Sequence, residues 1–150
     1  MKASELLKGL QYSVICGDED IEIKEIYNDS RKVGAQGLFF CIVGAKFDGH
    51  EYIDLTGESP VLLVVQNDVT PGPVVLIVKV ESTRYAMGII SSNFYGNPSS
   101  KLTVIGITGT KGKTTTTYMI REMLMSAGHK TGLIGTIEIM DGKEVIPANN

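Results

Sequence analysis

The chain has little of what secreted proteins and nucleic-acid-binding proteins need. It contains two cysteines in 150 residues, and two isolated cysteines make no disulfide framework, which favours a reducing compartment such as the cytoplasm. Its formal net charge is only −3, so it lacks the basic surface that binds nucleic acid. With 17 glycines and 5 prolines, the composition does not indicate a disordered tract. We therefore expect a globular cytoplasmic protein that binds no nucleic acid.

Long apolar segments are also missing. The longest apolar runs, such as residues 38–43, are far shorter than the roughly 20 residues that cross a bilayer. The opening segment 1–12 has no apolar centre of the kind found in signal peptides. We therefore expect no membrane insertion and no export signal. The hydrophobic fraction of 43% is nevertheless enough for one packed domain, or for a small domain and part of another.

One stretch, residues 102–128, organises the chain. Residues 102–108 are apolar and β-branched and predict a buried strand. A glycine-rich loop follows, and Thr115–Ala127 then has helical periodicity, with Gly128 as the expected C-cap. The apolar positions that we expect on the buried helix face are Ile120, Met123, Leu124 and Ala127. Strand, glycine loop and helix in this order are the context of a phosphate-binding loop.

The loop has the residue types that phosphate binding requires. Glycine lets the backbone approach a phosphate closely, and the start of a helix offers free N–H groups and the positive end of its dipole. Lys113 can reach the β- and γ-phosphates of ATP, and the Thr114 hydroxyl can ligate Mg²⁺. The residues that we expect to hold ATP are Gly109, Thr110, Lys111, Gly112, Lys113, Thr114 and Thr115. The alternative is a glycine turn that merely joins strand to helix, but the Gly-Lys-Thr-Thr ending favours the phosphate site.

Strands and helices alternate along the rest of the chain, which predicts an α/β fold. The expected helices span residues 4–10 and 82–95, the latter capped by Ser82. The expected strands span residues 21–26, 37–43, 61–65, 74–78 and 131–134, with a turn at 71–73 and a hairpin centred on Asp141-Gly142. Turn residues cluster at 96–100. We therefore expect a small α/β domain over residues 1–97 and the start of an ATP-binding α/β domain over residues 98–150.

The second expected domain has few strands. It contains the strand–loop–helix unit, one more strand and a hairpin, whereas nucleotide-binding α/β sheets usually have more strands than that. No acidic residue follows a later apolar strand as a second Mg²⁺ ligand. We therefore expect the chain to be the N-terminal part of a longer enzyme.

A second polar constellation flanks the apolar run at 37–43. Asp29-Ser30-Arg31 precedes it and Asp48-Gly49-His50 follows it. These loops could lie at opposite ends of one strand, or close together if the chain doubles back. On the residues alone, two ordinary polar loops remain an alternative to a binding site.

In combination, these motifs resemble the Mur ligase family of ATP-dependent amide-forming enzymes. The stretches that carry the resemblance are Asp29-Ser30-Arg31, Gly37 to Phe40, Gly44, Asp48 to His50, Tyr95 to Ser99, Ile105 to Thr115 and Gly132 to Thr136. The resemblance covers nearly the whole chain. It departs from the family at Lys111, where asparagine is usual, and at residues 55–60, which are shorter and more polar. The general phosphate-loop pattern also has glycine where this chain has Ile107.

The resemblance implies a role for individual residues. It implies that Ser30 contacts the UDP end of a substrate, that Gly109–Thr115 hold ATP with Lys113 as the catalytic lysine, and that Thr114 ligates Mg²⁺. Asn150 is similar to the first residue of a substrate-binding Asn-Thr-Thr motif. Further catalytic residues of the family fall beyond residue 150, so we do not expect these residues alone to catalyse the reaction.

The resemblance also implies a reaction. The branch that this chain resembles joins a diamino acid, L-lysine or meso-diaminopimelate, to UDP-MurNAc-L-Ala-D-Glu through an acyl phosphate. A related branch adds D-alanyl-D-alanine but usually has serine at the position of Thr110, and it stays an alternative. A non-catalytic module that binds a UDP-sugar or a nucleotide is a second alternative. We expect a monomer in either case.

Overall fold

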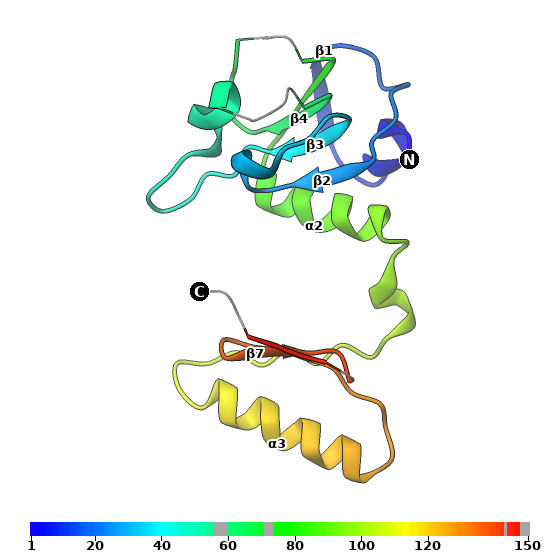
Figure 1. The fold of residues 1–150 in the computed structure, drawn as a ribbon, viewed down its shortest axis with the longest axis vertical. Helices are drawn as coiled ribbons and strands as arrows, with labels where there is room; N and C mark the ends of the chain where they lie inside the picture. The colour runs from blue at the N-terminus through cyan, green and yellow to red at the C-terminus, as the bar shows by residue number, and fades with distance from the viewer. Residues whose placement is uncertain (56–59, 71–73, 143, 148–150) are drawn as a thin grey trace. The chain divides into compact units, whose positions relative to one another are not determined.

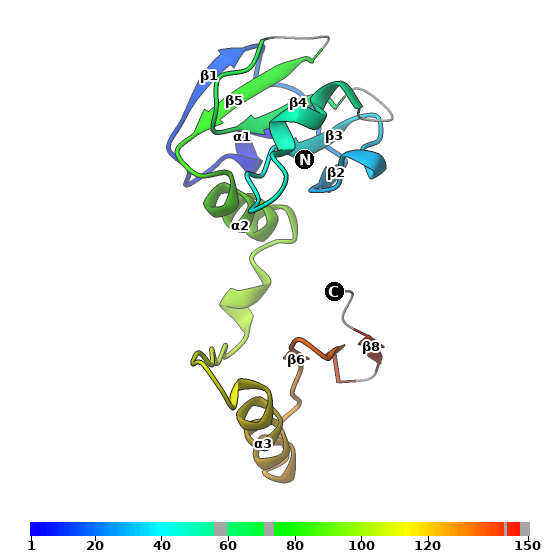
Figure 2. The ribbon, with the colours of Figure 1, turned by 90° about the vertical axis from the view of Figure 1, so that its left-hand side faces the viewer.

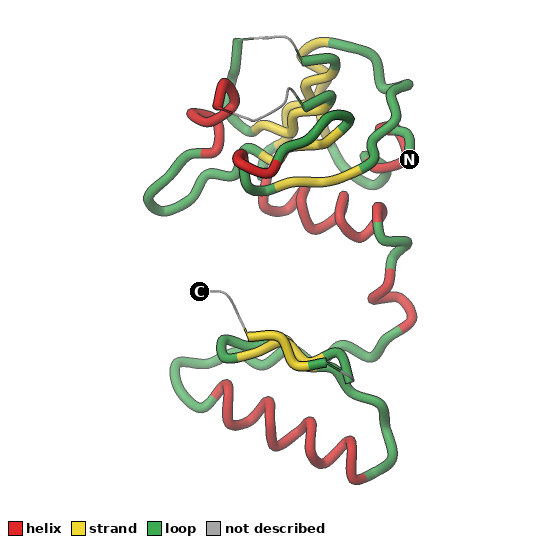
Figure 3. The backbone as a smooth tube through the Cα atoms, in the orientation of Figure 1, coloured by secondary structure: helices red, strands yellow, loops and turns green. Residues whose placement is uncertain are grey.

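The computed structural model describes residues 1–150 except 56–59, 71–73, 143 and 148–150. The chain separates into two compact units, Met1–Leu102 (unit 1) and Thr103–Asn150 (unit 2), and both units contain helices and strands (Figures 1 and 3). The predicted α/β class is therefore confirmed. The turn predicted at 71–73 and Asn150, which was expected to bind substrate, lie outside the described residues.

Unit 1 is built on a five-stranded sheet with the order β1-β5-β4-β3-β2. Its strands are β1 (Tyr12–Cys16), β2 (Glu25–Tyr27), β3 (Gly37–Phe40), β4 (Leu62–Val65) and β5 (Leu76–Val80). Strands β2 to β5 run parallel, and β1 pairs antiparallel with β5. The helices are α1 (Ala3–Leu6) and α2 (Thr83–Phe94), with 3-10 helices η1 (Ser30–Lys32), η2 (Gly49–Leu55) and η3 (Pro98–Lys101).

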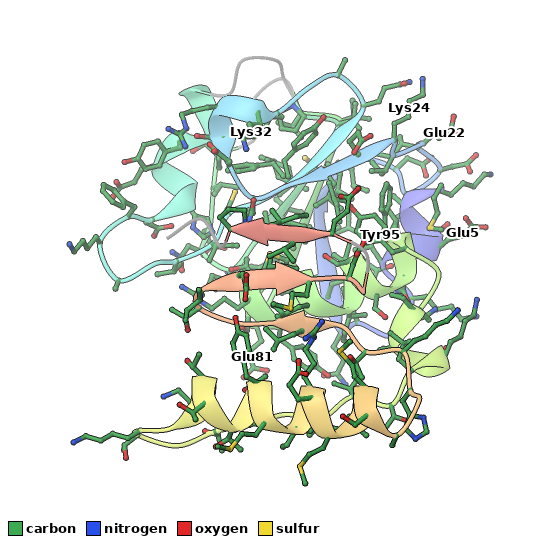
Figure 4. The ribbon with its side chains drawn as sticks, turned by 60° about the horizontal axis from the view of Figure 1, so that its bottom comes forward. Glu5, Glu22, Lys24, Lys32, Glu81 and Tyr95 are labelled. Atoms are coloured by element: carbon green, nitrogen blue, oxygen red, sulfur yellow. The ribbon has the colours of Figure 1, made fainter. Side chains whose placement is uncertain are left out.

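The sheet of unit 1 buries apolar side chains on both faces because its central strands are apolar throughout. Helices α1 and α2 cover one face (Figures 1 and 2), where Phe40 packs in a core with Leu6 and Ile90. On the other face, Phe39 packs in a second core that includes Val33. Two-sided burial is typical of parallel strands, which explains the continuous apolar runs in the sequence. The labelled charged side chains in Figure 4 are exposed on this unit.

Cys41, directly after β3, is fully buried in the second core, whereas Cys16 is half-buried. Burial, together with the nearby negative charge of Asp48, raises the pKa of the Cys41 thiol to about 12. Both thiols are free, in keeping with the expectation that two isolated cysteines form no disulfide framework. Among the described residues, no helix has both the length and the apolar character needed to span a membrane.

The sequence predicted β3, β4, β5 and α2 of unit 1 correctly but not every element. Ser82 caps α2 as expected, because its Oγ accepts a hydrogen bond from Tyr85 N at 3.3 Å. Strand β1 was not predicted. Buried and exposed side chains do not alternate regularly along it, and the strand that pairs with it, β5, lies far away in the sequence, with Tyr12 opposite Val80. The strand expected at 21–26 begins only at Glu25, and the opening helix ends already at Leu6.

Unit 2 consists of one helix and a three-stranded antiparallel sheet. These elements are α3 (Lys113–Ser126), β6 (Leu133–Ile134), β7 (Glu138–Met140) and β8 (Val145–Pro147), with the sheet order β6-β7-β8. The predicted hairpin is confirmed: β7 pairs with β8, and Glu144 N donates to Asp141 Oδ1 at 2.8 Å. Gly142 has φ +93° in this turn, a conformation that glycine adopts without strain.

For unit 2, one prediction was wrong and another was correct only in part. Residues 102–108 form no strand, and Leu102, Val104 and Ile105 are 68%, 72% and 53% exposed. A strand needs a hydrogen-bonded neighbour, and in the described part of unit 2 the sheet consists of β6, β7 and β8 alone. The buried face predicted for the helix holds only in part. Ile120 and Leu124 are half-buried, but Ala127 is exposed and Met123 is 71% exposed. Thr117 and Tyr118, which were not predicted, line a pocket with residues of β6.

Candidate functional site

Two glycines of the loop before α3 have a positive φ angle. Gly109 has φ +148° and Gly112, the residue that caps α3, has φ +77°. A Cβ on Gly112 would meet no other atom within 4 Å. Glycine is therefore needed there for its left-handed backbone and not because neighbouring atoms crowd it.

The start of α3 presents free N–H groups. The first backbone bond of the helix joins Thr116 N to Gly112 O at 2.9 Å, so the amides of Lys113, Thr114 and Thr115 have no acceptor within the helix. These amides and the helix dipole together favour an anion. The helix itself begins at Lys113, two residues earlier than the sequence predicted.

Lys113 lies across the loop. Its Nζ donates to the carbonyl oxygen of Gly109 at 2.6 Å, which holds the amine on the loop side of the helix end. A phosphate would be a stronger acceptor than this neutral carbonyl, because the ammonium group would then meet an acceptor of opposite charge. Thr110 and Lys111, in the same loop, are exposed.

A shallow pocket of about 180 Å³ adjoins the loop. Its lining residues are Ile107, Lys113, Thr114, Thr117, Tyr118 and Leu133 to Ile137. The structure therefore brings the expected residues Lys113 and Thr114 together with a turn, Gly135 to Ile137, that the site prediction did not include. The signal for that turn was present, because Gly135-Thr136 follows an apolar run in the sequence.

The two polar loops of unit 1 lie close together, which settles one alternative that the sequence left open. Helices η1 and η2 pack against each other, and they follow the carboxyl ends of the neighbouring parallel strands β2 and β3. Ligands of open α/β sheets bind at this end of the strands. Ser30, half-buried, is the first residue of η1.

Asp29 and Arg31 form a local pair that caps η1. The Arg31 guanidinium donates from Nε to Asp29 Oδ1 at 2.9 Å and from a terminal nitrogen to Oδ2 at 2.8 Å, and the Arg31 amide donates to Oδ1 at 3.1 Å. These hydrogen bonds to the ionised carboxylate lower the pKa of Asp29 to about 2. Arg31 remains exposed, so the pair shapes the turn around Ser30 and adds little stability.

Asp48 and His50 have a structural role that the sequence did not predict. The His50 side chain is only 8% exposed and its Nδ1 contacts Asp48 Oδ1, while Nε2 accepts hydrogen bonds from Gln66 N at 3.1 Å and Asn67 N at 3.3 Å. Because amide nitrogens only donate, the ring has its proton on Nδ1. The hydrogen bonds from the His50 amide and ring lower the pKa of Asp48.

The chain matches the family model described as Mur ligase middle domain over residues 107–150. Two relatives are each named UDP-N-acetylmuramoyl-L-alanyl-D-glutamate--2,6-diaminopimelate ligase, the first with the numeral 1. The Clostridium acetobutylicum protein is 47% identical, with 99% of this chain and 31% of that protein aligned. The Clostridium perfringens protein is 45% identical, with the same shares aligned. The chain thus spans about a third of the length of the curated relatives that it matches.

Comparison with solved structures points to the same family. A crystal structure of MurF from Acinetobacter baumannii superposes with a TM-score of 0.60 at 26% identity, covering 83% of this chain and 27% of that one. The likeness extends over most of the chain, whereas the family model covers its last part. The matched middle-domain model and the relatives, which align with almost every residue, together show that the chain belongs to the Mur ligase family.

Proposed function

We propose that the chain is the part of an ATP-dependent ligase that binds the UDP-linked substrate and the nucleotide. The ligase joins meso-diaminopimelate to UDP-MurNAc-L-Ala-D-Glu. The observation that carries the proposal is the glycine loop with Lys113 at the start of α3, beside a pocket. The names of the relatives support the substrates and favour diaminopimelate over lysine.

The loop residues fit the phosphates of ATP. The free amides of Lys113 to Thr115 offer donors, the two left-handed glycines keep side chains away, and Lys113 supplies a positive charge. Thr114 lines the pocket and offers a hydroxyl for Mg²⁺. No group of three or more His, Cys, Asp and Glu side chains that could hold a metal occurs among the described residues. With ATP bound, the Thr114 hydroxyl would be a ligand that this chain offers to Mg²⁺, and the ion would neutralise the charge of the phosphates.

The reaction uses these groups in two steps. An oxygen of the D-glutamyl γ-carboxylate attacks the γ-phosphorus of ATP, the bond to the β-phosphate oxygen breaks, and ADP leaves. The amine of diaminopimelate then attacks the resulting acyl phosphate, loses a proton and expels inorganic phosphate from the tetrahedral intermediate. Lys113 stabilises the negative charge shared by the β- and γ-phosphates during the first step.

A hybrid ligase tests the proposal. In it, this chain replaces the matched part of the Clostridium acetobutylicum relative. With ATP, Mg²⁺ and UDP-MurNAc-L-Ala-D-Glu, we expect ADP release and a UDP-MurNAc-tripeptide when meso-diaminopimelate is added. Faster product formation with L-lysine or D-alanyl-D-alanine would overturn the substrate assignment. ATP binding without any ADP release, when the parent relative is active, would favour the non-catalytic module.

Ser30 tests the UDP-binding role of unit 1. Its hydroxyl can both donate and accept, and it lies in η1 at the carboxyl end of the parallel strands. We expect Ser30→Ala in the hybrid ligase to weaken UDP-MurNAc-L-Ala-D-Glu binding about five- to tenfold, or about 1–1.4 kcal/mol, with ATP binding unchanged. Ser13→Ala, in the exposed part of β1, is the matched control. Equal loss of both ligands, or of neither, would remove Ser30 from the site.

A further inference from the structure

Tyr118 lies on the pocket side of α3, one helical turn beyond Thr114. Residues four apart share a face of a helix, and both side chains line the pocket with Thr117. Lys113 and Thr114 lie at the phosphate-loop end of this wall, and Tyr118 lies farther along it. The role proposed above uses Lys113 and Thr114 but gives Tyr118 no function.

Glu138, the first residue of β7, makes two hydrogen bonds on the side of the pocket opposite α3. Its side-chain Oε1 accepts a hydrogen bond from the Tyr118 hydroxyl. Its backbone oxygen accepts a hydrogen bond from Gly135 N at 3.1 Å, which closes the two-residue turn Thr136-Ile137 between β6 and β7. That turn lines the pocket. One residue therefore joins α3, which starts at the phosphate loop, to the turn that faces it.

Few other contacts fix the distance between α3 and the turn Gly135 to Ile137. Among the described residues of unit 2, Leu133 is the one fully buried apolar side chain, so apolar packing between α3 and the sheet is thin. A hydrogen bond between a hydroxyl and a carboxylate is short, directional and about twice as strong as a neutral one. The carboxylate also raises the pKa of Tyr118, which keeps the hydroxyl a donor at neutral pH.

We propose that Tyr118 and Glu138 are a positioning pair that holds the turn Gly135 to Ile137 at a fixed distance from the phosphate loop. The inference rests on the proposed function: the turn faces the loop across the pocket where phosphoryl transfer takes place. Displacing it affects the transfer step and leaves ATP binding at the helix end unchanged. Reactions of this kind are sensitive to position, and a 1 Å displacement costs up to about a hundredfold in rate.

Two variants separate the hydrogen bond from the charge. Tyr118→Phe removes only the donor hydroxyl, whereas Glu138→Gln removes the charge but keeps an acceptor oxygen. Tyr85→Phe is the matched control, because Tyr85 lies in unit 1 and is 70% exposed. The first measurement is amide hydrogen exchange of Gly135 in the 150-residue chain. The second is kcat and the KM for ATP, from ADP release by the hybrid ligase.

We expect Tyr118→Phe to speed Gly135 exchange and to lower kcat about tenfold, with the KM for ATP within about twofold of the parent. Glu138→Gln should stay within about threefold of the parent in kcat, and Tyr85→Phe should match the parent. Parental exchange and kcat in Tyr118→Phe would overturn the proposal, as would equal losses in kcat and ATP affinity. A hybrid ligase without activity refutes the proposed function instead, and the exchange of Gly135 still decides the role of the pair.

Discussion

Lys113 is the residue on which the proposed nucleotide site depends most. Its amine contacts the Gly109 carbonyl, and this bond spans the loop from its first glycine to the first residue of α3. A bound phosphate competes with the carbonyl for the amine. The exchange favours phosphate, because the amine then meets a charged acceptor. The amine is therefore held on the side of the loop where the proposed function places the γ-phosphate.

We expect Lys113→Ala in the hybrid ligase to lower the rate of ADP release at least about a hundredfold. Losing one preorganised charged donor from such a site costs on the order of 3 kcal/mol of transition-state stabilisation. The side chain is exposed, so the fold should keep its stability, which thermal unfolding of the variant checks.

Lys111→Asn is the matched control for this prediction. Lys111 lies in the same loop, is exposed and is not among the residues that line the pocket. We expect its activity to stay within roughly tenfold of the parent, less than about 1.4 kcal/mol. An active Lys113→Ala together with an inactive Lys111→Asn would show that the catalytic lysine is Lys111.

Gly49 is the residue of unit 1 where a side chain is least tolerable at an ordinary backbone conformation. A Cβ there would lie 2.6 Å from Ile42 N and 2.9 Å from Cys41 C, and backbone atoms cannot move aside cheaply. We expect Gly49→Ala to lower the free energy of unfolding by about 1–3 kcal/mol, measured by urea denaturation.

Gly88→Ala gives the opposite result and serves as its control. Gly88 lies inside α2, and its Cβ would meet nothing within 4 Å. Alanine is the better helix former, so we expect a gain of about 0.5–1 kcal/mol. A loss in both variants would mean that α2, and not the contact at Gly49, limits the stability of unit 1.

At the scale of elements, one hydrogen-bond network fastens three parts of unit 1 together. His50 joins η2 to the end of β4 through Gln66 N. The Gln66 side chain in turn accepts from Thr83 N at 3.2 Å and from Thr83 Oγ1 at 2.9 Å, at the start of α2. Thr83 is fully buried, so its hydroxyl needs this partner. The network fixes η2 beside η1, which carries Ser30.

This network makes unit 1 sensitive to acid. The pKa of Asp48 is lowered in the folded chain from about 3.9 in an unfolded one. Its stabilising effect is therefore present above about pH 4 and is lost as the pH falls through the lower folded value. We expect Asp48→Asn to be less stable than the parent at pH 7 and to lose less stability between pH 5 and pH 2, measured by urea unfolding. Equal slopes in the two proteins would exclude Asp48 as a cause.

The sequence predicted elements best where one local signal decides the structure. The apolar runs of β3, β4 and β5 and the cap at Ser82 were visible because burial and capping depend on few neighbouring residues. The strand prediction for residues 102–108 failed for the opposite reason, since an apolar run becomes a strand only when another strand pairs with it. The loop motif points to Lys113 and Thr114, which line one pocket in the structure, and their roles stay predictions. Tyr118 and Glu138 could not be paired from the sequence, because they meet only through the three-dimensional fold.

At the scale of the whole molecule, the chain consists of two units that differ in how completely they are packed. Unit 1 buries apolar side chains on both faces of its sheet. Unit 2 exposes several apolar side chains, among them Ile134 at 85% and Val104 at 72%. The contrast predicts that unit 1 is the more stable of the two, because buried apolar area is the main stabilising contribution.

Limited proteolysis tests the predicted boundary between residues 97 and 98. The compact units divide at Leu102, and residues 96–101, which include η3, are exposed. We expect the first tryptic cut after Lys101, leaving a fragment that keeps the far-ultraviolet dichroism of a folded α/β domain. Mass spectrometry identifies the fragment. A first cut between 37 and 43, inside the run that forms β3, would contradict the boundary.

Because Cys41 is buried, the rate at which its thiol reacts can measure how often unit 1 opens. At pH 8 a thiol with a pKa of about 12 is almost entirely protonated and hardly reacts with disulfide reagents, whereas the half-buried Cys16 remains accessible. A reagent such as dithionitrobenzoate should therefore label the native chain in two phases, Cys16 first and Cys41 only when unit 1 opens. The slow phase then reports how often the sheet of unit 1 opens, without denaturant and with the chain's own cysteines.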